Sequence, residues 1–333
     1  MHLYTRREMA KLALVALPAM AFLNARRLSA AATPAAPAAK PNSKIKGVQL
    51  SLNVPYSFGP GNMTGDEILA ACVALNLSSL ELRAQPIEAF MGAPAPVSSE
   101  RTAAARKATA TPEERKAATA LDKESHERLR MWRAAAPMTA AKAFRKKYEE
   151  AGVEIGILKL DRVFQLSDEE LDYGFTLAKA VGARAISTEI SFDENELKRV
   201  GAFADKHKFW IGYHGHATTT PAMWEKAFAV AEYNGANVDL GHFVAGDNGS
   251  VVEFIKKHHE RITHVHLKDR KKGLGPNMPF GQGDTPVAEV LKLIRDEKWP
   301  IEGTIEFEYT VPADSTRMAE IARALNYCRA ALA

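Results

Sequence analysis

The chain has 333 residues, a formal net charge of +4 and two cysteines, Cys72 and Cys328. Residues 1–32 hold five basic residues and one acidic residue, so they account for the whole net charge. The near-neutral remainder argues against nucleic acid or a charged membrane surface as a partner. Two cysteines exclude a disulfide framework. Both lie in apolar helical contexts, where we expect buried thiols, with a single bridge as the alternative.

The first 41 residues have the pattern of an export signal followed by a linker. Arg6 and Arg7 precede an apolar run over 12–23, and an Ala/Pro-rich stretch follows. The run is too short to span a bilayer, which takes about 20 apolar residues. A charged start, a short apolar core and small residues afterwards predict export, with no stable membrane insertion once the signal is cleaved. The paired arginines resemble a twin-arginine signal and predict a periplasmic or otherwise exported protein; an ordinary Sec signal or an uncleaved anchor is the alternative.

From residue 46 onward, strand-like and helix-like segments alternate. Short apolar, β-branched runs predict strands at 47–53, 79–83, 153–159, 183–189, 209–214, 236–242, 262–269 and 303–309. Helices are predicted at 66–75, 140–151, 167–181, 194–206, 221–233, 250–259, 286–297 and 315–332. Eight strand–helix units in one run predict an α/β fold, a (β/α)8 TIM barrel that forms a single domain over 46–333.

One segment interrupts the alternation between the second strand and its helix. Residues 92–137 are rich in Ala, Thr and charged side chains. Within this insertion, 113–133 pairs Glu and Arg at helical spacing, which predicts a solvated helix. The insertion is interpreted as a mobile arm on the strand-end face of the barrel. The alternative is a lid or an oligomer contact, since loops on this face carry function.

The last three predicted strands each end at a side chain that binds metals. Asp239, His266 and Glu306 occupy these positions. In a parallel barrel the carboxyl ends of all strands share one rim, so the three side chains are expected to converge. Two carboxylates and one imidazole form a mixed oxygen and nitrogen site for a divalent metal ion.

Five short motifs lie at the ends of the later strands. They are GYHGH at 212–216, NVDLGH at 237–242, HVHLKD at 264–269, PFGQGD at 279–284 and TIEFE at 304–308. The last four resemble, in order, the sixth-strand, seventh-strand, loop and eighth-strand motifs of the xylose isomerase-like sugar phosphate isomerase/epimerase superfamily. The first is similar to a fifth-strand motif of one branch, with Gly215 in place of an Asn.

The resemblance implies a metal site and its ligands. In that superfamily one divalent ion (Mn, Co, Mg or Zn) is held by a fifth-strand Glu, a sixth-strand Asp, a seventh-strand His and an eighth-strand Glu. The last three correspond to Asp239, His266 and Glu306. His214 stands where the fifth-strand Glu is expected, so Glu189, at the end of the fourth strand, is predicted to supply the missing carboxylate. His214 is then a fifth ligand or a proton-transfer group.

The implied chemistry is proton transfer next to a carbonyl through an enediolate, as in a metal-dependent sugar isomerase or epimerase. Glu189, His214 and Glu306 are the predicted catalytic residues. Predicted substrate-binding residues are His216, His242, Lys268, Asp269 and Glu308, with Glu308 also an alternative to Glu306. A lyase or dehydratase acting on a keto-sugar, keto-glycoside or polyol is the second hypothesis, and a non-catalytic exported sugar-binding barrel is the third. The expected partner is a small-molecule sugar, and a homo-oligomer is an open possibility.

Replacing both Arg6 and Arg7 by Lys should keep the precursor in the cytoplasm, because a twin-arginine signal is recognised through its two arginines. Cell fractionation of a tagged precursor measures this outcome. Normal export of the double variant would leave an ordinary Sec signal as the explanation.

Overall fold

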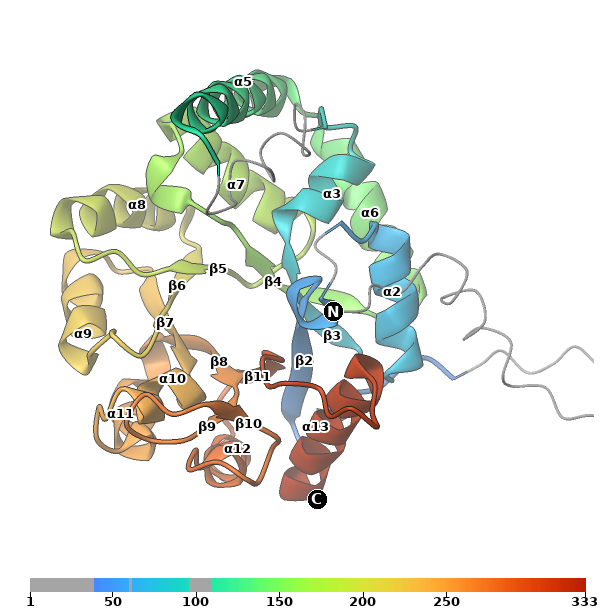
Figure 1. Ribbon diagram of the computed structural model, residues 1–333, viewed down its shortest axis with the longest axis vertical. Coiled ribbons are helices and arrows are strands. Elements are labelled where there is room, and N and C mark those ends of the chain that lie inside the picture. The colour runs from blue at the N-terminus through green and yellow to red at the C-terminus, as the bar shows by residue number, and fades with distance from the viewer. Residues whose placement is uncertain (1–38, 60–61, 96–109) are drawn as a thin grey trace, which may run out of the picture. The chain divides into compact units, whose positions relative to one another are not determined.

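The computed structural model describes residues 39–59, 62–95 and 110–333, and the predicted export signal lies outside them apart from its last residues. Eight parallel strands close into a barrel, because β2 pairs with both β11 and β3 at the two ends of the strand order (Figure 1). They are β2 (Val48–Val54), β3 (Ser79–Arg83), β4 (Glu154–Lys159), β5 (Ala185–Glu189), β6 (Trp210–His214), β7 (Asn234–Asp239), β8 (Ile262–Leu267) and β11 (Glu302–Ile305). The predicted TIM barrel is confirmed.

Helices surround the strands and cover the outside of the barrel (Figure 1). They are α2 (Gly65–Ala74), α3 (Ala84–Phe90), α5 (Pro112–Ala135), α6 (Met138–Glu150), α7 (Asp168–Ala180), α8 (Glu194–His207), α9 (Pro221–Val230), α10 (Leu240–Ala245), α11 (Val251–His258), α12 (Val287–Asp296) and α13 (Arg317–Leu332). Short 3₁₀ turns are η1 (Tyr56–Phe58), η2 (Val163–Gln165) and η3 (His259–Arg261).

Local sequence explains where several helices begin. The Ser167 side chain accepts a hydrogen bond from the Glu170 backbone, and Glu170 binds back to the Ser167 backbone, which is the predicted capping box at the start of α7. Thr64 with Glu67 starts α2 in the same way. Each pair satisfies amide groups that a helix terminus leaves without intrahelical partners.

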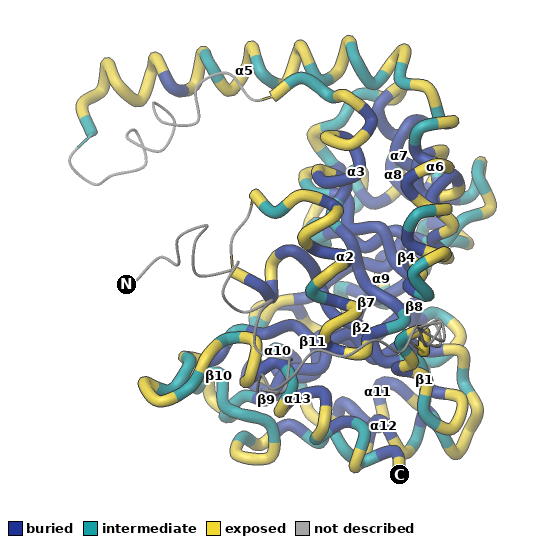
Figure 2. Tube along the Cα trace, turned by 90° about the vertical axis from the view of Figure 1, so that its right-hand side faces the viewer, coloured by how far each residue is buried: buried dark blue, intermediate teal, exposed yellow. Residues whose placement is uncertain are grey.

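Successive side chains of each strand point alternately outward and inward, which gives the barrel an apolar outer layer and a polar interior. A Cβ atom built on Gly303 in β11 would touch Leu291 of α12, so this position faces the helices. The positions on either side, Glu302 and Thr304, therefore point inward, and Thr304 is hydrogen-bonded to Ser51 of β2 inside the barrel at 2.8 Å. Figure 2 shows the buried strands as the centre of the molecule. The barrel interior therefore contains polar and ionisable side chains that can take part in a reaction.

Six elements differ from the sequence prediction. The sixth barrel strand, β7, ends at Asp239 and not at the predicted 242, because the Asp239 carboxylate caps the short helix α10 by accepting from the His242 backbone N–H. The eighth strand ends at Ile305, before the predicted 309. Helix α3 and the hairpin of β9 (Asp269–Arg270) with β10 (Asn277–Met278) were not predicted; neither were β1 (Lys44–Ile45) and its antiparallel pairing with β2.

The insertion contains the predicted helix, α5, whose side chains are almost all exposed or half-exposed (Figure 2). Its carboxyl-terminal end is tied to the barrel by Arg133. The Arg133 guanidinium binds Glu88 of α3 at 2.8 Å and Glu170 of α7 at 2.9 Å, and all three side chains are about nine-tenths buried. Trp132 packs edge-on against Tyr173 of α7. The insertion is therefore anchored at this end.

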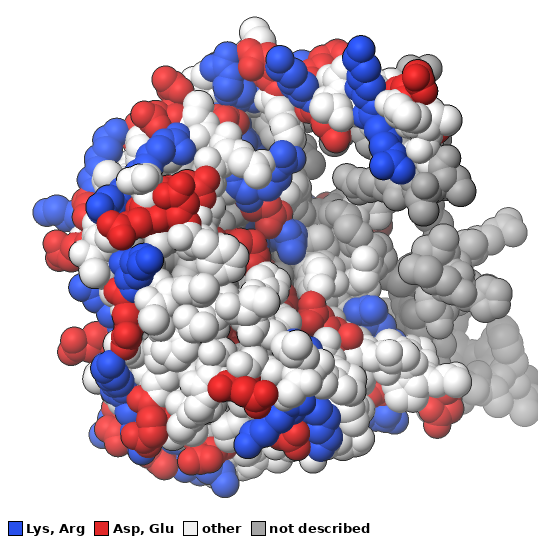
Figure 3. Space-filling model, turned by 60° about the vertical axis from the view of Figure 1, so that its left-hand side comes forward, with Lys and Arg blue, Asp and Glu red and all other residues white. Residues whose placement is uncertain are grey.

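The described helices and surface charges can be compared with the expectations about membrane and nucleic-acid partners. Among the described residues, no helix is both long enough and apolar enough to cross a bilayer. On the face drawn in Figure 3, acidic and basic side chains are interspersed. Cys72 and Cys328 are both buried with free thiols.

Arg133→Ala should destabilise the protein by about 3–5 kcal/mol, because two buried carboxylates lose their partner charge. Urea unfolding followed by circular dichroism measures this change. Arg130→Ala on the same helix is the matched control, since its ion pair with Glu127 is exposed and contributes little. Equal effects of the two variants would show that the Arg133 contacts do not stabilise the fold.

Candidate metal centre

Four side chains converge at the carboxyl ends of four neighbouring strands. His214 ends β6, Asp239 ends β7, His266 lies near the end of β8, and Glu306 follows β11 directly. The strand register sets Asp239 beside His266, and His266 beside Thr304. One ligand atom from each of the four lies within 4.8 Å of the others, and all four residues are buried.

The spacing of these atoms suits a bound ion. Nε2 of His214 is 3.6 Å from Oδ2 of Asp239 and 3.8 Å from Oε2 of Glu306. Nδ1 of His266 is 3.8 Å and 3.4 Å from the same two oxygens. Ligands about 2.1 Å from one ion in tetrahedral geometry lie about 3.4 Å apart. His214 Nε2, Asp239 Oδ2 and His266 Nδ1 are buried without hydrogen-bond partners in the described part of the chain.

The second polar atom of each histidine is held by a carboxylate. Nδ1 of His214 is 3.0 Å from Oε2 of Glu189, and Nε2 of His266 is 2.6 Å from Oε2 of Glu81. Each carboxylate accepts a hydrogen bond from the N–H group of one ring nitrogen. The other ring nitrogen is directed at the converging atoms. Carboxylates that orient metal-binding histidines in this way are common in metal sites.

The two converging carboxylates are fixed in the same manner. Oδ1 of Asp239 accepts the backbone N–H of His242 at 2.7 Å. Oε1 of Glu306 accepts from Nδ2 of Asn53, on β2, at 2.9 Å. All four side chains therefore have one atom bound to the surrounding protein and one atom facing a common point. These residues fit a divalent metal ion with two nitrogen and two oxygen ligands.

Buried charges shift the pKa values of these groups. Burial lowers the pKa of His266, but the carboxylates of Glu81 and Glu306 outweigh it and raise the pKa to about 10. Burial raises the pKa of Glu306, but the cations of Lys268 and His266 hold it well below its usual range. Burial also raises the pKa of Asp239, but the cation of Lys268 outweighs it and lowers that pKa. Both carboxylates are therefore ionised at neutral pH.

A lysine ammonium lies at the edge of the cluster. Nζ of Lys268 is 2.7 Å from Oε2 of Glu306, 2.6 Å from Oε2 of Glu308 and 3.1 Å from Oδ2 of Asp239. The contact with Asp239 has the distance of an ion pair without hydrogen-bond alignment. Three carboxylates and one ammonium leave two negative charges, which matches a divalent cation.

Two further histidines lie above the cluster. His242 has Lys268 at 3.1 Å and Arg270 at 2.7 Å from its ring nitrogens. Burial and the cation of Lys268 outweigh the Asp239 carboxylate and lower the pKa of His242 to about 4, so His242 is neutral. His216 is half-exposed, and its ring centroid is 4.9 Å from that of His214 and 5.0 Å from that of His242. These two predicted substrate-binding residues therefore border the centre.

Glu189 takes a different place from the predicted one. The sequence predicts it as a ligand, yet the converging group contains His214, and Glu189 lies behind it. The Glu189 carboxylate binds Lys159 at 2.6 Å, His216 at 2.7 Å and His214 at 3.0 Å. Burial raises the pKa of Glu189, but these partners outweigh it and hold the pKa far below its usual range. The geometry gives Glu189 the role of orienting two histidines.

Asp269 also differs from its predicted role in substrate binding. Its carboxylate accepts the backbone N–H groups of Gly281, Gly283 and Thr285 at 2.8, 2.9 and 3.2 Å. A Cβ on Gly283 would overlap the carboxylate, so this position requires glycine. Asp269 therefore organises the loop after β8, which is the loop of the PFGQGD motif.

The sequence prediction missed Glu81 and Asn53. Glu81 is fully buried in β3, and Asn53 is fully buried in β2. The available signal was a polar residue inside an apolar strand, since a buried acid or amide requires partners. Their partners lie 185 and 253 positions away in the chain, and no local pattern encodes such contacts.

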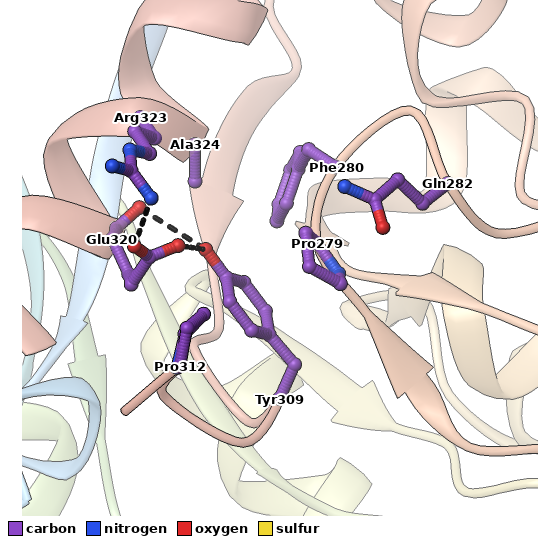
Figure 4. A pocket seen from close by; sticks show the side chains of 8 residues that line it. All are labelled: Pro279, Phe280, Gln282, Tyr309, Pro312, Glu320, Arg323 and Ala324. Carbon is purple, nitrogen blue, oxygen red and sulfur yellow. Dashed lines mark hydrogen bonds and ion pairs between the residues drawn. The ribbon is translucent and has the colours of Figure 1, made fainter. Parts of the chain in front are cut away.

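Two pockets lie near the strand-end face. One, of about 430 Å³, is lined by Tyr56, Gly59, Asn277, Phe307, Glu308 and Arg317, and Glu308 links it to the converging cluster. The other, of about 190 Å³, lies between the 279–282 loop and α13 and contains none of the converging residues (Figure 4).

Comparison with known proteins identifies the type of barrel. Residues 194–331, which contain all four converging side chains, match the family described as xylose isomerase-like TIM barrel. The chain is 30% identical to inosose dehydratase of Clostridium botulinum strain Eklund 17B over 127 residues, or 36% of this chain and 37% of that protein. The inosose dehydratase of Clostridium perfringens strain 13 is 27% identical over 123 residues. The chain thus matches little more than a third of the length of these curated relatives.

Solved structures resemble the whole barrel. The probable 3-DHS dehydratase AsbF of Bacillus anthracis has a TM-score of 0.54 at 14% identity, covering 82% of this chain and 97% of its own. The IolI protein, solved with a zinc atom, has a TM-score of 0.55 at 13% identity, covering 86% and 98%. At such identities the likeness shows the fold. The family match over residues 194–331 confirms the predicted resemblance to the xylose isomerase-like superfamily for that part of the chain.

Asp239→Ala and His266→Ala should each lose most of the bound metal, while the wild-type protein purifies with close to one divalent ion per chain. Strand-end residues on this barrel face serve function more than stability, so the circular dichroism spectrum should change little. Metal content is measured by mass spectrometry of the purified proteins.

His258→Ala, which removes a histidine of α11 far from the cluster, should keep its metal. Apparent affinity should also rise with pH, by about tenfold per unit for each proton released, because the raised pKa of His266 means that a proton competes with the ion. Full metal retention in His266→Ala, or affinity independent of pH, would contradict the assignment.

Proposed function

We propose that this xylose isomerase-like TIM barrel is a metal-dependent enzyme that removes a proton from the carbon next to the carbonyl group of a sugar or cyclitol. One observation carries the proposal: four buried side chains, His214, Asp239, His266 and Glu306, converge on the strand-end face, and three of their facing atoms have no partner within the described residues while Lys268 binds the fourth. Two imidazoles and two carboxylates favour zinc, manganese or cobalt over magnesium. The ion, when bound, would stabilise the negative charge that develops on the carbonyl oxygen.

Glu306 is the group best placed to accept the proton. It is ionised, and Oε2 lies on the open side of the cluster beside Lys268. Lys268 also contacts Glu308, which is partly exposed. This chain of contacts connects Glu306 with the partly exposed Glu308 through the Lys268 ammonium. Glu308 is thus proposed to assist Glu306, and Glu306 remains the base.

His214 is engaged at both nitrogens, with Glu189 at Nδ1 and the converging atoms at Nε2. It is therefore proposed as a ligand and not as a proton-transfer group. Glu189 is held by three partners, so it is a positioning residue. These assignments leave one carboxylate base, Glu306, at the centre.

His216 supplies a candidate acid. Its Nε2 is 2.7 Å from Glu189, and this hydrogen bond raises the pKa of His216, which favours the imidazolium form. A base at the centre and an acid at its rim are what elimination of water requires, because one group removes the proton and the other protonates the departing hydroxyl. This arrangement favours a dehydratase or lyase. The curated relatives named inosose dehydratase support the same choice.

An isomerase, the first hypothesis drawn from the sequence motifs, is the second candidate. A single base suffices for isomerisation when the same carboxylate returns the proton to the adjacent carbon. Inversion at one carbon by an epimerase takes a second base on the opposite side of the substrate, and Glu189 lies outside the converging group of four, bound to Lys159, His214 and His216. The geometry thus supports a lyase first, an isomerase second and an epimerase third.

Incubation of the metal-loaded protein with inosose, D-fructose or D-xylulose in heavy water should place deuterium on the carbon beside the carbonyl of at least one of them. Glu306→Gln should slow this exchange by about 10²–10⁴-fold, the range expected for removal of a general base. Nuclear magnetic resonance measures the exchange, and mass spectrometry of the product separates loss of water from unchanged mass.

Glu225→Gln, a carboxylate bound to Lys257 and His258 outside the centre, should exchange at the wild-type rate. Metal content is measured for each variant, because Glu306→Gln also alters a proposed ligand. No exchange and no product with metal fully bound would refute the enzyme, and the non-catalytic sugar-binding barrel would replace it.

A further inference from the structure

The pocket of about 430 Å³ extends from the candidate centre. Its lining residue Glu308 lies 2.6 Å from Nζ of Lys268, which in turn contacts Glu306. Its volume falls within the range of small-molecule sites, about 300–1,000 Å³. A substrate whose reacting group lies at the centre can therefore continue into this pocket.

The side of the pocket nearest the centre is rich in hydrogen-bonding groups. The hydroxyl of Tyr56 donates to Oε1 of Glu308 at 2.5 Å, and Nδ2 of Asn277 donates to Oε2 at 3.3 Å. Oδ1 of Asn277 is buried and has no partner within the described residues. A buried carbonyl oxygen without a partner costs free energy, so a ligand hydroxyl that donates to it is favoured.

The opposite side carries a cation. The guanidinium of Arg317 stacks on the Phe307 ring at 4.9 Å and donates to the Ser57 carbonyl at 3.1 Å. Among the described residues no carboxylate forms an ion pair with it, which leaves donors for a ligand. Because Arg317 and Glu308 line the same pocket, its charge is balanced. A neutral polyhydroxyl group fits this lining better than a phosphate, which the Glu308 carboxylate would repel.

Tyr56 adds an apolar surface. Arg83 lies 5.5 Å from the centre of its ring, and the side chain remains 41% exposed. Flat aromatic faces pack well against the C–H faces of sugar rings. The 190 Å³ pocket in Figure 4 offers no comparable polar group without a partner among the described residues, because Glu320 already binds Tyr309, Ser315 and Arg323.

We propose that the larger pocket binds a second sugar ring, so that the substrate is a neutral glycoside whose reacting ring lies at the candidate centre. The proposal rests on the proposed function, because it takes the centre as the place of reaction. Arg317 and Asn277 are assigned to the hydroxyl groups of the second ring, and Tyr56 to one of its faces.

Binding of unreactive sugars tests the proposal without turnover. Cellobiose, maltose, sucrose and trehalose are titrated into the metal-loaded protein beside glucose and fructose, and calorimetry gives each dissociation constant. At least one disaccharide should bind about tenfold more tightly than its component monosaccharides. Arg317→Ala and Asn277→Ala should each remove most of this advantage, about the loss expected for one hydrogen bond to a charged or buried group.

Arg323→Ala on the same helix, α13, is the matched control and should keep the advantage. Disaccharides that bind no better than monosaccharides, or an advantage that survives both Arg317→Ala and Asn277→Ala, would overturn the second-ring assignment. If deuterium exchange still occurs with a monosaccharide, the proposed function stands and the pocket assignment alone fails. If no exchange occurs with any sugar, the proposed function fails, whatever the binding data show.

Discussion

The candidate centre depends on a carboxylate buried in the middle of the barrel. Glu81 lies in β3, three strands away from β8 around the barrel, and its 2.6 Å contact with His266 fixes the orientation of that imidazole. Placing an ionised carboxylate in such surroundings is expensive unless it is paired. Because His266 compensates that charge, the ring cannot rotate away without leaving Glu81 alone. The other converging side chains follow the same rule, since each has one atom committed to the protein and one to the centre.

This arrangement also accounts for the polar interior of the barrel. TIM-barrel interiors are usually filled by branched apolar side chains, whereas here Ser51, Glu81, Asn237 and His264 are all fully buried. Asn237 donates to Ser187 and lies 3.0 Å from His266, so the layer beneath the centre is a hydrogen-bonded platform. Such networks hold a single arrangement when their members are satisfied; here Oδ1 of Asn237 and Nε2 of His264 have no partner within the described residues. Polar side chains thus replace part of the usual apolar packing of the barrel interior and hold the converging residues in place.

Sequence patterns were sufficient for the barrel and for three of the four converging side chains. Asp239, His266 and Glu306 each end a short apolar strand, and parallel strands must share a rim. The choice between Glu189 and His214 could not be made in this way. The two residues are direct neighbours in the register of β5 and β6, and which one faces the centre depends on side-chain direction and on Lys159, a buried partner from another strand. Glu81 and Asn53 were beyond reach for the same reason, because their roles come from contacts across the barrel.

Lys268 bears on whether folding of the candidate centre would require a metal ion. Its ammonium already compensates part of the charge on Asp239, Glu306 and Glu308, so the carboxylates are not forced apart by repulsion before an ion arrives. Folding is therefore separable from metal uptake, in contrast to small metal-dependent domains that are unfolded without their ion. An ion that enters meets a finished binding geometry and displaces protons, with no chain rearrangement required. If the centre holds an ion as proposed, uptake could follow closure of the barrel and need not accompany folding.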